Sequence, residues 1–113
     1  MSTELTIHVE DQDGTVTIRP EGEVDLAHSP SLRHRLMEVI TEGPTRVILD
    51  LAHVPYMDSS GVATLVEALQ QCRGRDARLV LAAMQPRVRS VFEIARLDTV
   101  FTICDDLQTA QEC

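Results

Sequence analysis

The chain has 113 residues, 43% of them hydrophobic, and its formal net charge is −8. This length suits one compact domain, residues 1–113, with a single core. Because non-specific binding to DNA or RNA depends on clustered positive charge, the acidic balance argues against a direct nucleic-acid partner.

The cysteines and the apolar runs indicate in which cellular compartment the protein works. Cys72, Cys104 and Cys113 are odd in number and lack CxxC or CxxH spacing, so neither a disulfide framework nor a zinc site is implied. The N-terminal segment is acidic and alternating, unlike a signal peptide. The longest apolar run, residues 79–84, is far shorter than the roughly 20 residues of a membrane span. We therefore expect a cytoplasmic protein without membrane insertion.

The first part of the chain predicts a β-hairpin and then a helix. Apolar and polar residues alternate over residues 5–9 and again from Val16, with turn chemistry at residues 11–14 between them. Ser29 is a good N-cap before Pro30, so a helix should start there and close near Gly43. The elements expected after it are a strand at 46–51, a helix at 61–73, a strand at 78–83, a helix from Gln85 and Pro86, a strand at 99–103 and a short helix capped at Asp105 or Asp106.

This order predicts an α/β fold with a mixed sheet of about four to five strands and about four flanking helices. The N-terminal hairpin should be antiparallel. The later strands, which are joined through helices, should be parallel with right-handed crossovers. In such sheets, sites gather beyond the carboxyl ends of the parallel strands.

Several candidate site residues lie just beyond the carboxyl end of one predicted strand. Asp58, Ser59 and Ser60 follow a buried strand and precede a helix whose apolar positions begin at Val62. A helix N-terminus has free N–H groups and a positive dipole end, so it can tolerate a phosphorylated serine at Ser59. The same residues are equally consistent with ordinary N-capping.

The segment Gly22-Glu23-Val24-Asp25, together with Met57-Asp58-Ser59-Ser60-Gly61, closely resembles the STAS domain, in particular bacterial anti-sigma-factor antagonists, over nearly the whole chain. The resemblance implies that an anti-sigma factor that is also a serine kinase phosphorylates Ser59. It further implies that the unphosphorylated form binds this kinase and frees the sigma factor. The phosphorylated form is released, and a serine phosphatase acts on it to restore the unphosphorylated form.

The expected partner-binding residues lie around the same loop. They are Asp25, Glu23, Asp58, Ser60, Gly61 and Val62. A phosphoryl group would add about −1.5 to −2 charges beside Asp58, and beside Asp25 if the two loops share an edge. We expect this charge to change binding more than folding. Ala63 stands where many antagonists carry a glycine, so the first turn of this helix should approach partners slightly differently.

Two alternatives keep other functions open. The first is a STAS-type subunit that docks permanently on a lipid-transport ATPase or another assembly. The second is an enzyme with Ser59 as nucleophile and His28 or His53 as base, but no Gly-x-Ser-x-Gly elbow is present. No cofactor and no metal site are implied, so we expect a non-enzymatic interaction module. Self-association stays open.

Overall fold

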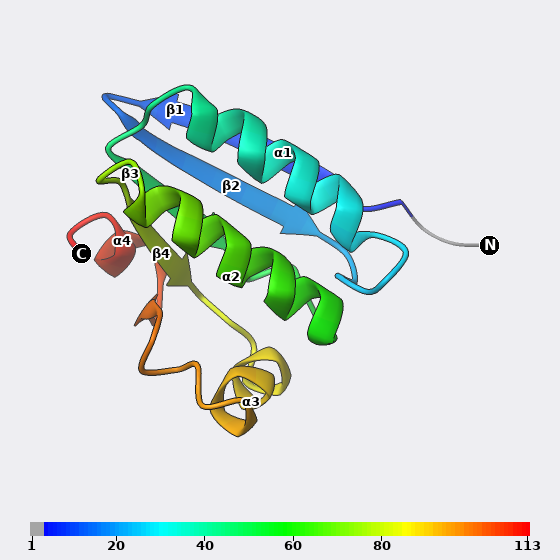
Figure 1. Ribbon diagram of the computed structural model, residues 1–113. Coiled ribbons are helices and arrows are strands. Elements are labelled where there is room, and N and C mark those ends of the chain that lie inside the picture. Colours follow the sequence, from blue (N-terminus) through cyan, green and yellow to red (C-terminus); the bar gives the residue numbers. More distant parts are fainter. Residues whose placement is uncertain (1–3) are drawn as a thin grey trace.

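The computed structural model describes residues 4–113, so the first residues of the expected domain lie outside the described part. Its elements follow the predicted order (Figure 1). They are β1 (Thr6–Gln12), β2 (Thr15–Glu21), α1 (Ser29–Thr41), β3 (Arg46–Asp50), α2 (Ser59–Arg73), β4 (Arg78–Ala82), α3 (Pro86–Ile94), β5 (Thr102–Cys104) and α4 (Leu107–Ala110).

The five strands form one sheet in the order β1-β2-β3-β4-β5. β1 and β2 are antiparallel and the other neighbouring pairs are parallel. The hairpin turns at Asp13 and Gly14, whose φ angles are +54° and +85°, a left-handed pair that suits a tight hairpin turn. The predicted mixed α/β fold is therefore confirmed.

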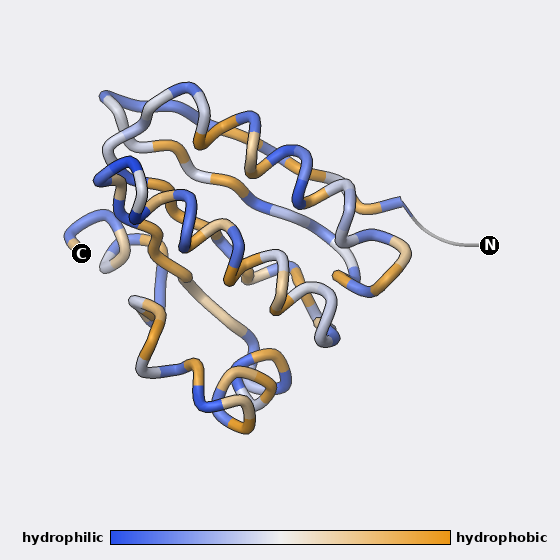
Figure 2. Tube along the Cα trace, viewed as in Figure 1, coloured by the Kyte–Doolittle hydropathy of each residue, from blue (hydrophilic) through white to orange (hydrophobic). Residues whose placement is uncertain are grey.

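The two faces of the sheet carry different layers. Val47 and Leu49 of β3 belong to the main core with apolar residues of α1 and α2, whereas Ile48 between them belongs to a second apolar cluster with Ala110 of α4. Side chains alternate along a strand, so α1 and α2 cover one face and α4 covers part of the other (Figure 1). Figure 2 shows the matching mixture of apolar and polar residues along α1 and α2, as expected for helices with one buried side.

Several element boundaries differ from the sequence prediction by one or more residues; α2, for example, starts at Ser59 instead of residue 61. Ser29 is not the N-cap of α1 but its first residue, because its N–H donates to the Asp25 carbonyl oxygen (2.8 Å) and a turn through His28 starts the helix early. The last strand is Thr102–Cys104 instead of 99–103, since the N–H groups of Val100 and Phe101 both donate to the Leu97 carbonyl oxygen. Because of these backbone hydrogen bonds, the residues just before β5 form a turn and cannot pair as a strand.

The cysteines also differ from expectation. Cys104 and Cys113 are joined by a disulfide, whereas their spacing implied no disulfide framework. The reason is tertiary: α4 has only four residues and turns the chain back toward β5, which brings the two sulfur atoms together. Cys72 is a free, buried thiol.

None of the helices within residues 4–113 combines the length and the apolar character that crossing a membrane requires.

Candidate functional site

The loops that follow β2 and β3 meet at one edge of the sheet. Val24 and Met57 form an isolated parallel bridge between these loops. The Val24 N–H donates to the Tyr56 carbonyl oxygen (3.0 Å), and the Asp58 N–H donates to the Val24 carbonyl oxygen (3.2 Å). The two motifs singled out in the sequence are therefore neighbours in space.

Asp58 joins these two loops to the start of α2. It is the N-cap, and its Oδ1 accepts hydrogen bonds from the Ser60 N–H (2.9 Å), the Ser60 hydroxyl (2.5 Å) and the Gly61 N–H (3.4 Å). Its Oδ2 accepts the N–H of Leu26 from the other loop (3.1 Å). One carboxylate thus fixes the helix start and the edge beside it.

These contacts lower the pKa of Asp58, with the Ser60 hydroxyl as the largest cause and the N–H groups of Ser60, Gly61 and Leu26 adding to it. Since the folded pKa lies below the unfolded one, the carboxylate stabilises the fold above its unfolded pKa, and this stabilisation disappears as the pH falls through the folded pKa.

We expect Asp58→Asn to flatten the acid-side dependence of stability, because the amide does not titrate. Urea unfolding of both proteins between about pH 2 and pH 7 would measure the free energy of unfolding. The wild type should lose more stability than Asp58→Asn below about pH 4. Equal slopes for the two proteins would contradict this role for Asp58.

The two serines have different environments. Ser59 is the first residue of α2 and is exposed, whereas the half-buried Ser60 donates its hydroxyl to Asp58. The sequence led us to expect free N–H groups at this helix start. Instead, the N–H groups of Ser60 and Gly61 are bonded to the Asp58 side chain, and that of Val62 is bonded to the Asp58 carbonyl oxygen (3.1 Å). Ser59 is consequently the accessible hydroxyl of the pair.

Asp25 organises the turn before α1. Its Oδ1 accepts the N–H groups of Ala27 (3.1 Å) and His28 (3.0 Å) and lies 2.7 Å from Nδ1 of His28. Glu23 on the same loop is exposed. Within residues 4–113, no hydrogen bond joins a histidine to Ser59, and the contact of His28 is with Asp25. The arrangement orders a surface loop.

Gly61 and Val62 lie below this surface. A Cβ atom on Gly61 would come within 2.6 Å of Cγ of Met57 and 2.8 Å of Cγ1 of Val24, so the residue allows α2 to approach the bridged loops. The Val62 side chain is 7% exposed and packs in the core, which corrects the expectation that it presents a contact surface. Met57 is likewise a core residue.

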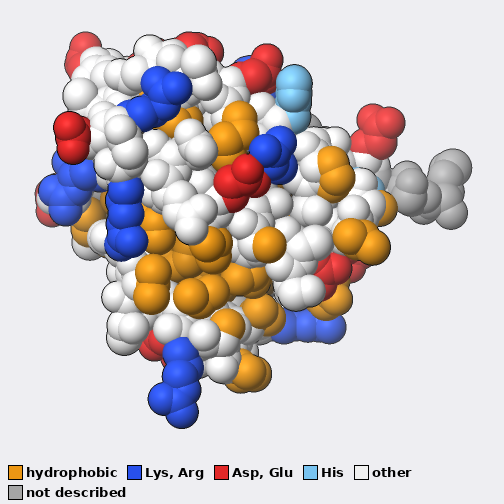
Figure 3. All heavy atoms as spheres, in the orientation of Figure 1, with side chains coloured by type: hydrophobic (Ala, Val, Ile, Leu, Met, Phe, Trp, Pro, Cys, Tyr) orange, Lys and Arg blue, Asp and Glu red, His pale blue; other side chains and the backbone are white. Residues whose placement is uncertain are grey.

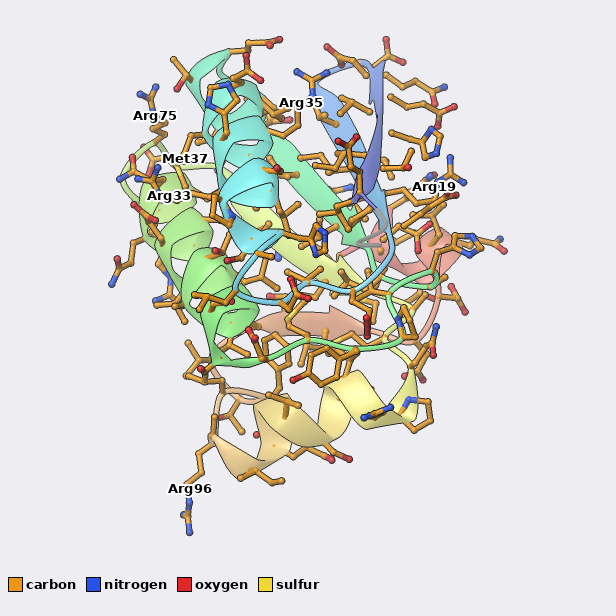
Figure 4. The ribbon with its side chains drawn as sticks, turned by 90° about the vertical axis from the view of Figure 1, so that its right-hand side faces the viewer. Arg19, Arg33, Arg35, Met37, Arg75 and Arg96 are labelled. Atoms are coloured by element: carbon orange, nitrogen blue, oxygen red, sulfur yellow. A yellow bond between two sulfur atoms is a disulfide. The ribbon has the colours of Figure 1, made fainter. Side chains whose placement is uncertain are left out.

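Some large apolar side chains lie exposed outside the core. Leu26, on the loop held by Asp58, is 77% exposed, and Ile94 at the end of α3 is 84% exposed. Figure 3 shows a further apolar surface between α2 and α3. Among the partly buried residues of these helices are Val66 and Val91, and the Arg96 side chain projects from beyond α3 into solvent (Figure 4).

The site is thus an ordered double loop that presents a serine hydroxyl at a helix start, flanked by exposed acidic and apolar side chains. It forms an ordered surface at one edge of an α/β domain. The STAS domain model matches residues 6–110, so the chain belongs to the STAS domain family.

Similar proteins within this family are named for one kind of regulator. BtrV of Bordetella bronchiseptica, an anti-sigma factor antagonist candidate, is 31% identical over 98 residues, which cover 87% of this chain and 84% of BtrV. Among solved structures, an anti-sigma factor antagonist from Mycobacterium paratuberculosis has a TM-score of 0.89 at 25% identity, covering 96% of this chain and 92% of its own. The Bacillus cell fate determinant SpoIIAA in its phosphorylated form has a TM-score of 0.74 at 25% identity, with coverage of 95% and 97%.

Proposed function

We propose that this protein is an anti-sigma factor antagonist in a cytoplasmic partner-switching pathway. Its unphosphorylated form binds an anti-sigma factor that is also a serine kinase and thereby releases the sigma factor. Phosphorylation of Ser59 abolishes the binding, and a serine phosphatase reverses it. The observation that carries the proposal is the exposure of Ser59 at the start of α2, on an edge ordered by Asp58. The similarity to a protein solved in a phosphorylated form supports it.

The charges around Ser59 support a switch based on repulsion. A phosphoryl group brings about −1.5 to −2 charges at neutral pH. The N–H groups of Ser60 and Gly61 already donate to Asp58, so these two offer the phosphoryl group little compensation. The negative charge therefore stays at a surface that also carries Asp25 and Glu23, and it opposes the docking of the kinase.

Ser59 is a substrate in this scheme and does not act as a catalyst. The kinase supplies ATP, magnesium and the catalytic groups, so the antagonist itself needs no cofactor. The docking face comprises the Asp58–Gly61 loop, the loop from Glu23 to Leu26 and the outer side of α2, and it continues onto the apolar surface between α2 and α3 (Figure 3).

Leu26 should act as an apolar anchor of this face. We expect Leu26→Ser to weaken binding of the kinase at least about tenfold, because burying a leucine side chain is worth roughly 1.5–3 kcal/mol. The free energy of unfolding should change by less than about 0.5 kcal/mol, since the side chain is 77% exposed. Leu26→Met, which keeps the apolar surface, is the matched control and should bind like the wild type. Unchanged binding by Leu26→Ser would remove this residue from the docking face.

Phosphosite mapping tests the function itself. The wild type, Ser59→Ala and Ser60→Ala would be recovered from native cells under growth and stress conditions, and their intact masses and phosphopeptides would be compared. We expect a phosphoryl increment on the wild type and on Ser60→Ala that is absent from Ser59→Ala. If no condition yields phosphate on the wild type, the switch is refuted and a permanent docking subunit becomes the better description. Phosphate confined to Ser60 would also refute the assignment.

A further inference from the structure

The face of the sheet opposite α1 and α2 carries a small apolar cluster of its own. Ile48, Val80 and Ala82 are fully buried there, together with Cys104 and with Ala110 of α4. Leu107 and Cys113 pack against the cluster from its edge. In Figure 4, Arg19 lies on this side of the sheet, away from Arg33 on α1. Burial of the cluster therefore depends on α4 staying in place.

The short helix α4 is weakly stabilised by its own backbone hydrogen bonds. It has four residues, far fewer than the roughly 12–15 that an isolated helix needs for marginal stability. Its N-cap Asp106 accepts the Thr109 N–H (2.7 Å), and a guanidinium nitrogen of Arg46 donates to the Gln111 carbonyl oxygen just after the helix. Besides the packing of Leu107 and Ala110, a further attachment is the bond between Cys104, at the end of β5, and Cys113, three residues beyond α4.

We propose that Cys104 and Cys113 form a reversible redox latch that fastens α4 over this cluster. Disulfides that form in reducing compartments are usually transient or redox-sensing rather than permanent. The bond closes a segment of sequence separation 9 that contains the whole of α4. Making or breaking it therefore acts on α4 directly, on the sheet face opposite α2 and its Ser59.

The latch closes by thiol–disulfide exchange with a small disulfide such as oxidised glutathione. The Cys113 thiolate attacks one sulfur of that disulfide and expels a thiolate, which takes up a proton and leaves a mixed disulfide. The Cys104 thiolate then attacks the Cys113 sulfur and expels the second small thiolate. Two protein thiols are oxidised, two electrons pass to the small disulfide, and a reduced small thiol reverses both steps.

The third cysteine is kept out of this chemistry by its surroundings. Cys72 lies at 0% exposure on α2, and burial raises the pKa of its thiol to about 11, so it rarely forms the reactive thiolate. Cys113 is partly exposed and open to a small disulfide. Oxidation should therefore select one pair of the three sulfurs.

Closing the latch should restrain α4. The Gln111 carbonyl oxygen that Arg46 contacts lies between α4 and Cys113, inside the segment that the bond closes. The oxidation state is thereby coupled to how firmly α4 is held.

The test is to equilibrate the full chain in buffers of oxidised and reduced glutathione and to map the disulfides by mass spectrometry after trapping the thiols. Amide hydrogen exchange of Ala110 and Gln111 would be followed in both states. We expect a Cys104–Cys113 linkage that is lost on reduction. Exchange at the two amides should be about tenfold slower when the bond is closed, while the amides of α2 stay unchanged.

Two cysteine variants distinguish an effect of the Cys104–Cys113 bond from other effects of the redox buffer. Cys113→Ser lies in a surface segment and should fold normally, and its α4 amides should exchange at the same rate in both buffers. Cys72→Ala, the matched control, should keep the redox difference. A glutathione adduct on Cys113 without the Cys104–Cys113 linkage would overturn the latch. A linkage that leaves the exchange of Ala110 and Gln111 unchanged would overturn it as well.

Discussion

Gly61→Ala should destabilise the fold by about 1–3 kcal/mol, the usual cost of inserting an atom into a well-packed interior. The new Cβ would lie 2.6 Å from Cγ of Met57, 2.8 Å from Cγ1 of Val24 and 3.0 Å from the Val24 carbonyl oxygen. The two side chains are held in the core, and the carbonyl oxygen accepts the Asp58 N–H, so none of the three can move freely. Urea unfolding followed by circular dichroism would measure the loss.

Gly74→Ala is the matched control for this effect. Gly74 ends α2 with a φ of −68°, and a Cβ atom there would meet its nearest neighbour at 3.6 Å. Alanine adopts this conformation without strain, so the substitution should be neutral or should stabilise the fold by up to about 1 kcal/mol. If Gly61→Ala were as stable as Gly74→Ala, the close approach of α2 to the bridged loops would not matter for the fold.

Much of the fold could be predicted because the sequence patterns are local. The alternation in the hairpin and the helical spacing after Val62 depend only on which side of each element is buried. The start of α1 could not be predicted in this way. Ser29 is a good N-cap by residue type, but the hydrogen bond from its N–H to the Asp25 carbonyl oxygen places it inside the helix.

The candidate site shows the same division between local and tertiary information. The motif around Ser59 pointed to the loop that the structure orders, and the capping role of Asp58 was visible from its place before the helix. The hydrogen bond from the Leu26 N–H to the second Asp58 oxygen joins residues that are 32 positions apart in the sequence, so no local pattern predicts it. The residue type of Leu26, an apolar side chain in a loop beside Asp25, did not reveal that it is exposed next to Asp58.

Ser59→Asp should strongly weaken binding of the kinase while leaving the fold intact. Docking a surface that now carries an uncompensated carboxylate should cost about 2 kcal/mol or more, roughly a thirty-fold loss of affinity. Ser59 is exposed and Asp58 remains the N-cap, so the free energy of unfolding should change by less than about 0.5 kcal/mol. Ser59→Ala would capture the kinase from native cells, and the affinity of that kinase for each variant would then be measured.

The neighbouring hydroxyl provides the sharpest control, because Ser60→Asp adds the same charge one residue away. The Ser60 hydroxyl lies 2.5 Å from Oδ1 of Asp58, so the substitution replaces a donor with a second carboxylate against the first. It should therefore lower the free energy of unfolding by about 1–3 kcal/mol, and its instability should be greatest above the pKa values of the two acids. The pair of variants separates binding at Ser59 from folding at Ser60. If Ser59→Asp unfolded the protein and Ser60→Asp did not, the assignment of the two serines would have to be exchanged.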